Sequence, residues 1–167
     1  MNPAGSLLVA AAVLALVGAS LGFGGGIVVG FALIPLALIL LAAGIVGSVI
    51  VTPDLDRVFV LLATGAASCA VLMALLGMLM AVDYEGIRRT VEGLLRPAFA
   101  ILVLAIVVFA ITGMATRQLP VFPAGAVAVG TLLLGAGLVE QERVADLGFW
   151  TSLAGWTGLG LMPWGRD

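Results

Sequence analysis

The chain has 167 residues, of which 63% are hydrophobic and only 10% are charged. Soluble domains carry about 25% charged residues, and a small domain has too much surface to hide so many apolar side chains. A water-soluble fold is therefore excluded, and the composition predicts an integral membrane protein. The formal net charge of −2, with Arg but no Lys and no His, is not the clustered basic face of a nucleic-acid-binding protein.

Apolar stretches long enough to cross a bilayer follow one another along the chain. A helix needs about 20 mostly apolar residues to cross the hydrocarbon core. The sequence contains five such stretches, each bounded by charged residues, Pro or Gly. They cover residues 4–22, 26–51, 58–82, 97–116 and 121–139. We therefore expect an all-α, polytopic transmembrane helical bundle that forms a single integral membrane domain over residues 1–167.

The first stretch is expected to stay in the mature protein as a transmembrane helix. No Lys or Arg precedes its apolar run, whereas a cleaved signal peptide normally begins with such residues.

The last apolar stretch, residues 147–164, leaves two interpretations open. It is long enough to cross the membrane, but it contains four Gly, three Trp and a Pro. Trp150 and Trp164 would lie roughly 21 Å apart along a helix. That spacing favours a short sixth span with one Trp near each membrane interface. The alternative is a segment that lies on the membrane surface.

The positions of the Arg residues predict the orientation. The loop 83–96 contains three Arg, whereas the loops on the opposite side contain only Arg57 and Arg117. The positive-inside rule then places loop 83–96 in the cytoplasm and the N-terminus outside. The C-terminus is inside with five spans and outside with six. The use of Arg without Lys, together with much Gly, Ala and Val, indicates a prokaryotic sequence and hence a cytoplasmic (inner) membrane.

The segment 83–96 is the most organised polar stretch. As a helix it is amphipathic, and Glu92–Arg96 is one of its opposite-charge pairs at i,i+4. The pattern predicts a helix on the inner membrane surface, with its Arg side chains near anionic headgroups. The alternative is a docking face for a cytoplasmic partner. The residues expected to make these contacts are Arg88, Arg89, Glu92 and Arg96.

Glycines repeat at every fourth position around the first predicted turn. Gly18, Gly22, Gly26 and Gly30 form a small-xxx-small pattern, which lets membrane helices approach closely. We expect them to pack the first two helices together, and homo-oligomerisation is the alternative. The turn 22–26 is not a nucleotide phosphate loop, because such a loop needs a Lys after its glycines.

The remaining polar residues predict no catalytic, cofactor-binding or metal-binding site. Asp54 and Asp56 lack further oxygen ligands, so we expect them to lie at a helix start that Thr52 caps. Glu140, Glu142, Arg143 and Asp146, which follow the fifth span, are expected to form a solvated loop. Without His or Lys, the chain cannot supply His ligands for haem, a Ser–His pair or a Schiff base. The predicted spans also lack the buried ionisable groups of proton relays and voltage sensors.

These features predict a non-enzymatic multi-pass membrane protein. Its expected role is an accessory or scaffold subunit of a membrane complex, with the lipid bilayer and other membrane subunits or a second copy as partners. The first alternative is a small channel or facilitator for a neutral or hydrophobic solute. The second alternative is an enzyme that modifies lipid headgroups at the membrane edge.

Overall fold

The computed structural model describes residues 3–23, 27–52, 54–80, 85–140 and 142–164. Side-chain surroundings are described for these residues except at positions 20–23, 27–32, 85–88, 138–140 and 142. Within this part of the chain all regular structure is helical, as the sequence predicts. The six helices are α1 (Pro3–Phe23), α2 (Ile27–Val51), α3 (Arg57–Leu79), α4 (Glu85–Ala115), α5 (Val121–Glu140) and α6 (Glu142–Leu161).

Local hydrogen bonds set the boundaries of the helices. Asp56 is the N-cap of α3, because its carboxylate accepts a hydrogen bond of 2.8 Å from the backbone N–H of Val58. The expectation that Thr52 caps this helix is therefore wrong, since the helix begins five residues later. After α4, Arg117 takes a left-handed φ of 58°, and the N–H groups of Gln118 and Leu119 donate to the carbonyl of Gly113. This turn reverses the chain tightly between α4 and α5.

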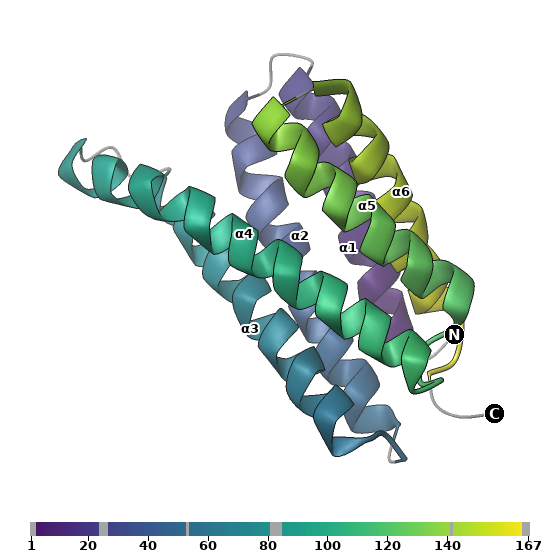
Figure 1. Cartoon of the computed structure of the whole chain (residues 1–167). Coiled ribbons are helices and arrows are strands. Elements are labelled where there is room, and N and C mark those ends of the chain that lie inside the picture. Colours follow the sequence, from purple (N-terminus) through teal and green to yellow (C-terminus); the bar gives the residue numbers. More distant parts are fainter. Residues whose placement is uncertain (1–2, 24–26, 53, 81–84, 141, 165–167) are drawn as a thin grey trace.

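The helices form a ring in chain order. Each helix packs against the next one, and α1 also packs against α6, which closes the ring (Figure 1). The closing contact depends on glycine, because a Cβ added at Gly160 would lie 2.6 Å from the carbonyl oxygen of Gly5. The start of α1 and the end of α6 lie at the same end of the bundle (Figure 1). A closed ring of helices has an interior, and the candidate site lies there.

Helix α4 is longer than a membrane span. Its 31 residues correspond to roughly 46 Å, whereas the hydrocarbon core is about 30 Å thick. Its first turns project past the other helices (Figure 1). The polar segment expected to be a separate surface helix supplies these turns, from Glu85 to Arg96, and the helix continues through Pro97 into the apolar part.

Three of the described segments are long and apolar enough to cross a membrane. They are Leu33–Val51, Arg57–Leu79 and Arg89–Ala115. The predicted number of five spans is not confirmed by length and composition. The described apolar parts of α1 and α5, Pro3–Ala19 and Val121–Gly137, are shorter.

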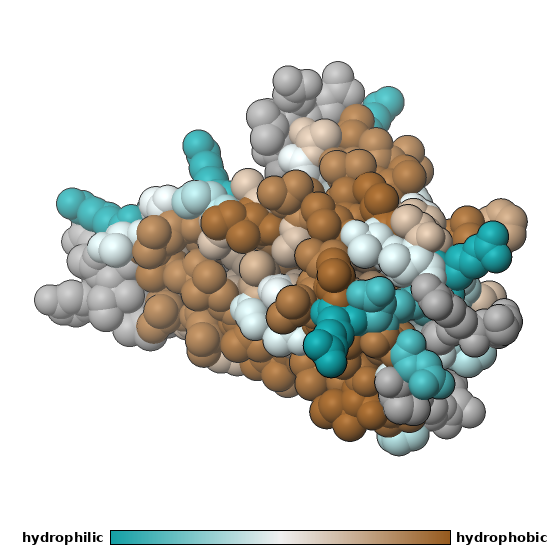
Figure 2. Space-filling model, turned by 60° about the horizontal axis from the view of Figure 1, so that its bottom comes forward, coloured by the Kyte–Doolittle hydropathy of each residue, from teal (hydrophilic) through white to brown (hydrophobic). Residues whose placement is uncertain are grey.

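The outer surface is suited to lipid rather than water. Large apolar side chains point outward along the helices, and Ile50 and Leu61 are 76% and 72% exposed. Figure 2 shows apolar residues covering most of one face, with hydrophilic residues confined to separate patches. Exposed apolar surface of this extent marks a membrane or protein contact. Together with the long apolar helices, it indicates a membrane protein.

Candidate functional site: a central apolar cavity

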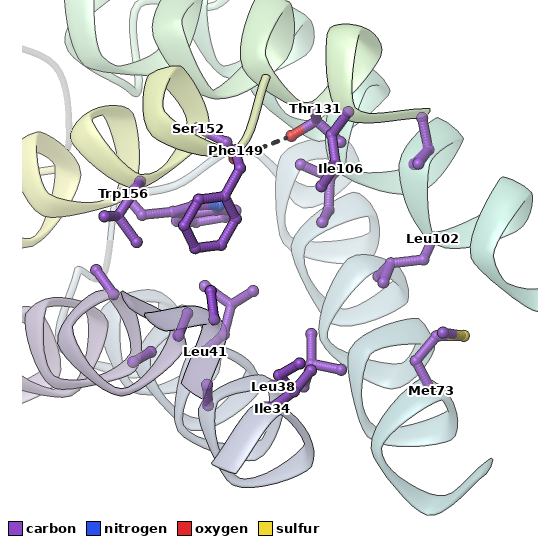
Figure 3. A pocket seen from close by; sticks show the side chains of 18 of the residues that line it. Ile34, Leu38, Leu41, Met73, Leu102, Ile106, Thr131, Phe149, Ser152 and Trp156 are labelled. Atoms are coloured by element: carbon purple, nitrogen blue, oxygen red, sulfur yellow. Dashed lines mark hydrogen bonds between the residues drawn. The ribbon is translucent and has the colours of Figure 1, made fainter. Parts of the chain in front are cut away.

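The interior of the ring contains a cavity of about 390 Å³. Side chains from α1 to α6 line it, and Figure 3 shows them converging on a common space. One lining residue from each helix, in chain order, is Ala12, Leu38, Met73, Leu102, Leu134 and Trp156.

Small residues on α1 leave the room for this cavity. Ala11, Ala12, Ala15 and Ala19 all lie on the inner face of the helix. A helix face occupied by Ala fills little of the ring interior, while the facing residues of α2 and α4, such as Leu38 and Leu102, are large. The space therefore follows from the distribution of side-chain sizes around the ring, because protein interiors are otherwise tightly filled.

Four aromatic side chains form a cluster that includes one residue of the cavity wall. Phe59 stacks on Phe109 with ring centroids 5.1 Å apart, and Phe109 stacks on Trp156 at 6.3 Å. Trp164 packs against Phe109 at 5.9 Å, and its indole N–H donates to the carbonyl of Leu159. Offset ring pairs at these distances are favourable beyond the area that they bury. Trp156 also lines the cavity, so this cluster fixes the position of one aromatic residue of the cavity wall.

The lining is almost free of polar groups. None of the described residues around the cavity is charged, and the hydroxyl-bearing ones are Thr131 on α5 and Ser152 on α6. Their hydroxyl oxygens lie 3.3 Å apart, across the contact between the two helices (Figure 3). Thr131 is only 4% exposed. The cavity therefore combines an apolar wall with one local hydrogen-bonding group.

Glycines place the two hydroxyls opposite each other. Gly130 and Gly137 on α5, and Gly148 and Gly155 on α6, are each seven residues apart and lie in the α5–α6 contact. A Cβ at Gly155 would lie 2.5 Å from the backbone nitrogen of Val127. A Cβ at Gly130 would likewise meet the backbone of Ser152. Close backbone approach is the usual effect of small residues between membrane helices.

Sequence reasoning missed these four glycines and the hydroxyl pair. The glycine repeat that the sequence singles out spans α1 and α2 instead. A Cβ at Gly18 would lie 3.1 Å from the Cβ of Leu33, so Gly18 lies at the contact between these helices. Gly26 lies outside the described residues, and the surroundings of Gly22 and Gly30 do too. A search for glycines seven residues apart in consecutive apolar stretches would have found the α5–α6 contact.

The charged residues singled out by the sequence lie away from the cavity. Arg89, Glu92 and Arg96 are exposed on the first turns of α4. Arg88 lies in the same turns, but its side chain is outside the described part. Arg143 and Asp146, expected in a loop, are exposed on the first turns of α6. Within the described residues, no group of three His, Cys, Asp or Glu side chains could hold a metal ion.

Comparison with known proteins adds no family to this geometry. No protein-family model, no curated protein and no solved structure matches the chain. Its function is therefore argued from the cavity and the surfaces described above.

Proposed function

We propose that the protein binds an apolar molecule from the bilayer inside the central cavity, as a binding protein or facilitator for a hydrophobic solute. The observation that carries this proposal is the cavity itself. Its volume of about 390 Å³ lies within the range of about 300–1,000 Å³ typical of small-molecule sites.

An unfilled cavity of this size would be costly. Cavities created in protein cores cost about 24 cal/mol per Å³. The cavity here is partly open, but the apolar side chains of its wall likewise lack contact atoms when it is empty, so an apolar occupant is favourable. Water is a poor occupant, because it needs two to four polar partners and the wall offers one hydroxyl pair. Hydrocarbon is the occupant that suits this wall.

We further propose that α1, α5 and α6 cross the membrane together with the three longer apolar segments. Helices of 20 or 21 residues are about 30 Å long and match the hydrocarbon core. They also line the same cavity as α2, α3 and α4. With the positive-inside rule, both chain termini are outside and the start of α4 lies in the cytoplasm, in the cytoplasmic membrane of a prokaryote.

Photolabelling in proteoliposomes tests the binding proposal. A diazirine-bearing alkyl chain should label residues of the lining, such as Leu38 and Phe149, and unlabelled hydrocarbon should compete. The change Ala15→Phe places a ring into the cavity and should reduce this labelling several-fold. The control Ala100→Phe adds the same ring on the exposed face of α4 and should leave it unchanged.

The binding proposal would be overturned by labels confined to lipid-facing positions. It would also be overturned if Ala15→Phe and Ala100→Phe changed the labelling of the lining equally. Both variants should first be shown to elute from size-exclusion chromatography like the unaltered protein.

The second candidate is a subunit of a larger membrane assembly, and the outward face of α3 favours it. Thr64, Gly65 and Ser68 are exposed in the middle of this helix, with exposed Leu61 and Leu72 on either side. The hydroxyls of Thr64 and Ser68 donate to backbone carbonyls four residues earlier. This part of the face therefore has only small side chains, and their hydroxyl hydrogens already have acceptors. Small residues on a membrane helix permit close contact with another helix. A second copy of this chain is the simplest occupant.

Association in vesicles tests the second candidate. Energy transfer between labelled copies should fall with Gly65→Leu, because a large side chain would hold the partner helix away. Nothing lies within 4 Å of a Cβ at Gly65, so the single subunit should tolerate the change. Ala100→Leu on the exposed face of α4 is the control. Unchanged energy transfer in Gly65→Leu would show that this face is not the interface.

A further inference from the structure

The hydroxyls of Thr131 and Ser152 are arranged differently from those of four other described residues on α3 and α6. Thr64, Ser68, Thr151 and Thr157 each donate to the carbonyl four residues earlier, at 2.8 or 2.9 Å. This local bond is the ordinary way for Ser and Thr to satisfy their hydrogen inside a helix. Among the described residues, Thr131 and Ser152 are instead bonded to each other, at 3.3 Å.

Counting hydrogens leaves one hydroxyl hydrogen available. Each hydroxyl has one hydrogen to donate and two lone pairs to accept. The single bond between Thr131 and Ser152 uses one hydrogen, whichever residue donates it. No described side chain or carbonyl accepts the other. A donor without an acceptor is unfavourable away from water, and here Thr131 is buried, Ser152 is half-buried and both line the apolar cavity.

The rest of the lining restricts what can accept this hydrogen. The described residues around the cavity carry no charge, so a carboxylate or phosphate inside would have no counter-ion. Phe149 and Trp156 lie three residues before and four residues after Ser152, on the same face of α6. Figure 3 shows both rings beside the hydroxyl pair. The acceptor is therefore surrounded by aromatic and aliphatic groups.

We propose that the ligand is an uncharged, largely hydrocarbon molecule with one carbonyl oxygen, which accepts a hydrogen bond from the Thr131–Ser152 pair. This inference rests on the proposed function, because it names the class of molecule that the cavity takes. The hydrocarbon part fills the space between α1, α2 and α4, and the carbonyl lies against α5 and α6. The pair then donates one hydrogen within itself and one to the ligand, so both are satisfied.

Competition against the diazirine alkyl probe tests the inference. The competitors are an n-alkane, a methyl ketone with the same number of heavy atoms, and the fatty acid anion of that length, compared at equal mole fraction in the bilayer. The ketone should compete about two- to tenfold better than the alkane, the range given by one net hydrogen bond. The acid anion should compete less well than the ketone.

Variants of the pair supply the decisive comparison. With Thr131→Val and Ser152→Ala together, the ketone should lose its advantage while the alkane competes as before. Thr131→Ala with Ser152→Ala also removes both hydroxyls and serves if the first double variant folds poorly. A single variant would not serve, because the remaining hydroxyl could still donate its hydrogen to the ketone. The matched control is Thr157→Val, because Thr157 is also on α6 but donates to Leu153.

The outcomes separate the two proposals. If neither alkane nor ketone competes with the probe, the proposed function fails. If both compete equally, or if the double variants keep the full ketone advantage, the carbonyl inference fails and the proposed function stands. If the acid anion competes as well as the ketone, the ligand is not restricted to uncharged molecules and the inference is overturned.

Discussion

Single residues decide how closely α5 and α6 approach. The clearest case is Gly148, where an added Cβ would lie 2.7 Å from the carbonyl oxygen of Gly130 and 2.7 Å from the carbonyl carbon of Leu133. Both neighbours are backbone atoms, which cannot rotate away as the end of a side chain can. The distance between the helices, and with it the hydroxyl pair, therefore depends on the missing methyl group.

The change Gly148→Ala should destabilise the protein by about 1–3 kcal/mol, the usual cost of overpacking a filled interior. The measurement is thermal unfolding in a mild detergent. Gly65→Ala is the matched control, because nothing lies within 4 Å of a Cβ there. Replacing Gly by Ala at an open helix position removes an entropic penalty of roughly 0.5–1 kcal/mol. Equal midpoints for the two variants would contradict the close contact described between α5 and α6.

At this same scale, sequence reasoning found the wrong glycines for the site. A spacing of four is an established pattern for membrane helices, and Gly18 does lie at the α1–α2 contact. The glycines of the α5–α6 contact are seven residues apart on each helix, so the pattern of glycines four residues apart does not include them. The pairing of the two hydroxyls could not be predicted from the sequence for another reason. Thr131 and Ser152 are 21 residues apart and meet only because the two helices are antiparallel.

At the scale of elements, the all-helical structure followed from the sequence because apolar runs in lipid must satisfy their own backbone groups. The limits of α4 did not follow. In the sequence, Pro97 predicts the start of a span, since Pro suits the first turn of a helix. In the structure the helix passes through Pro97, so that the polar segment from Glu85 and the apolar segment form one rod.

The start of α3 shows the opposite error. Thr52 before Pro53 resembles a helix start, yet the side chain that caps the helix is that of Asp56. Three residues of a capping type, Thr52, Asp54 and Asp56, lie close together here, and propensity alone does not rank them. Length and hydropathy do not fix the number of spans either. Charged residues in the first turns of α6 reduce its mean hydropathy, yet α6 lines the same cavity as the longer helices.

At the scale of the whole molecule, the cavity could not have been predicted. A helix that is apolar on all sides carries no pattern that tells which face points inward. The inward faces of α1 and α4 differ in side-chain size. This difference produces a cavity only because of the order of the helices around the ring, which the sequence does not show.

The proposed arrangement in the membrane predicts opposite locations for two exposed positions. In a Cys69→Ala background, Asp54→Cys should react with a membrane-impermeant maleimide from outside intact cells. Glu92→Cys should react only after the cells are opened. The two positions lie toward opposite ends of α3, because Asp54 precedes this helix and Glu92 lies in the first turns of α4, which follows it. Cys69→Ala without an added Cys is the blank, and labelling of both positions from the same side would contradict the arrangement.

The closure of the ring by α1 and α6 has a consequence for synthesis. The wall of the cavity is incomplete until α6 has left the ribosome and has reached α1, where Gly5 and Gly160 meet. Until then the inner faces of α1 to α5 are open to surrounding lipid along one side. A hydrocarbon chain already lying there would be enclosed as α6 docks, so the newly made protein would acquire its first occupant during its own assembly.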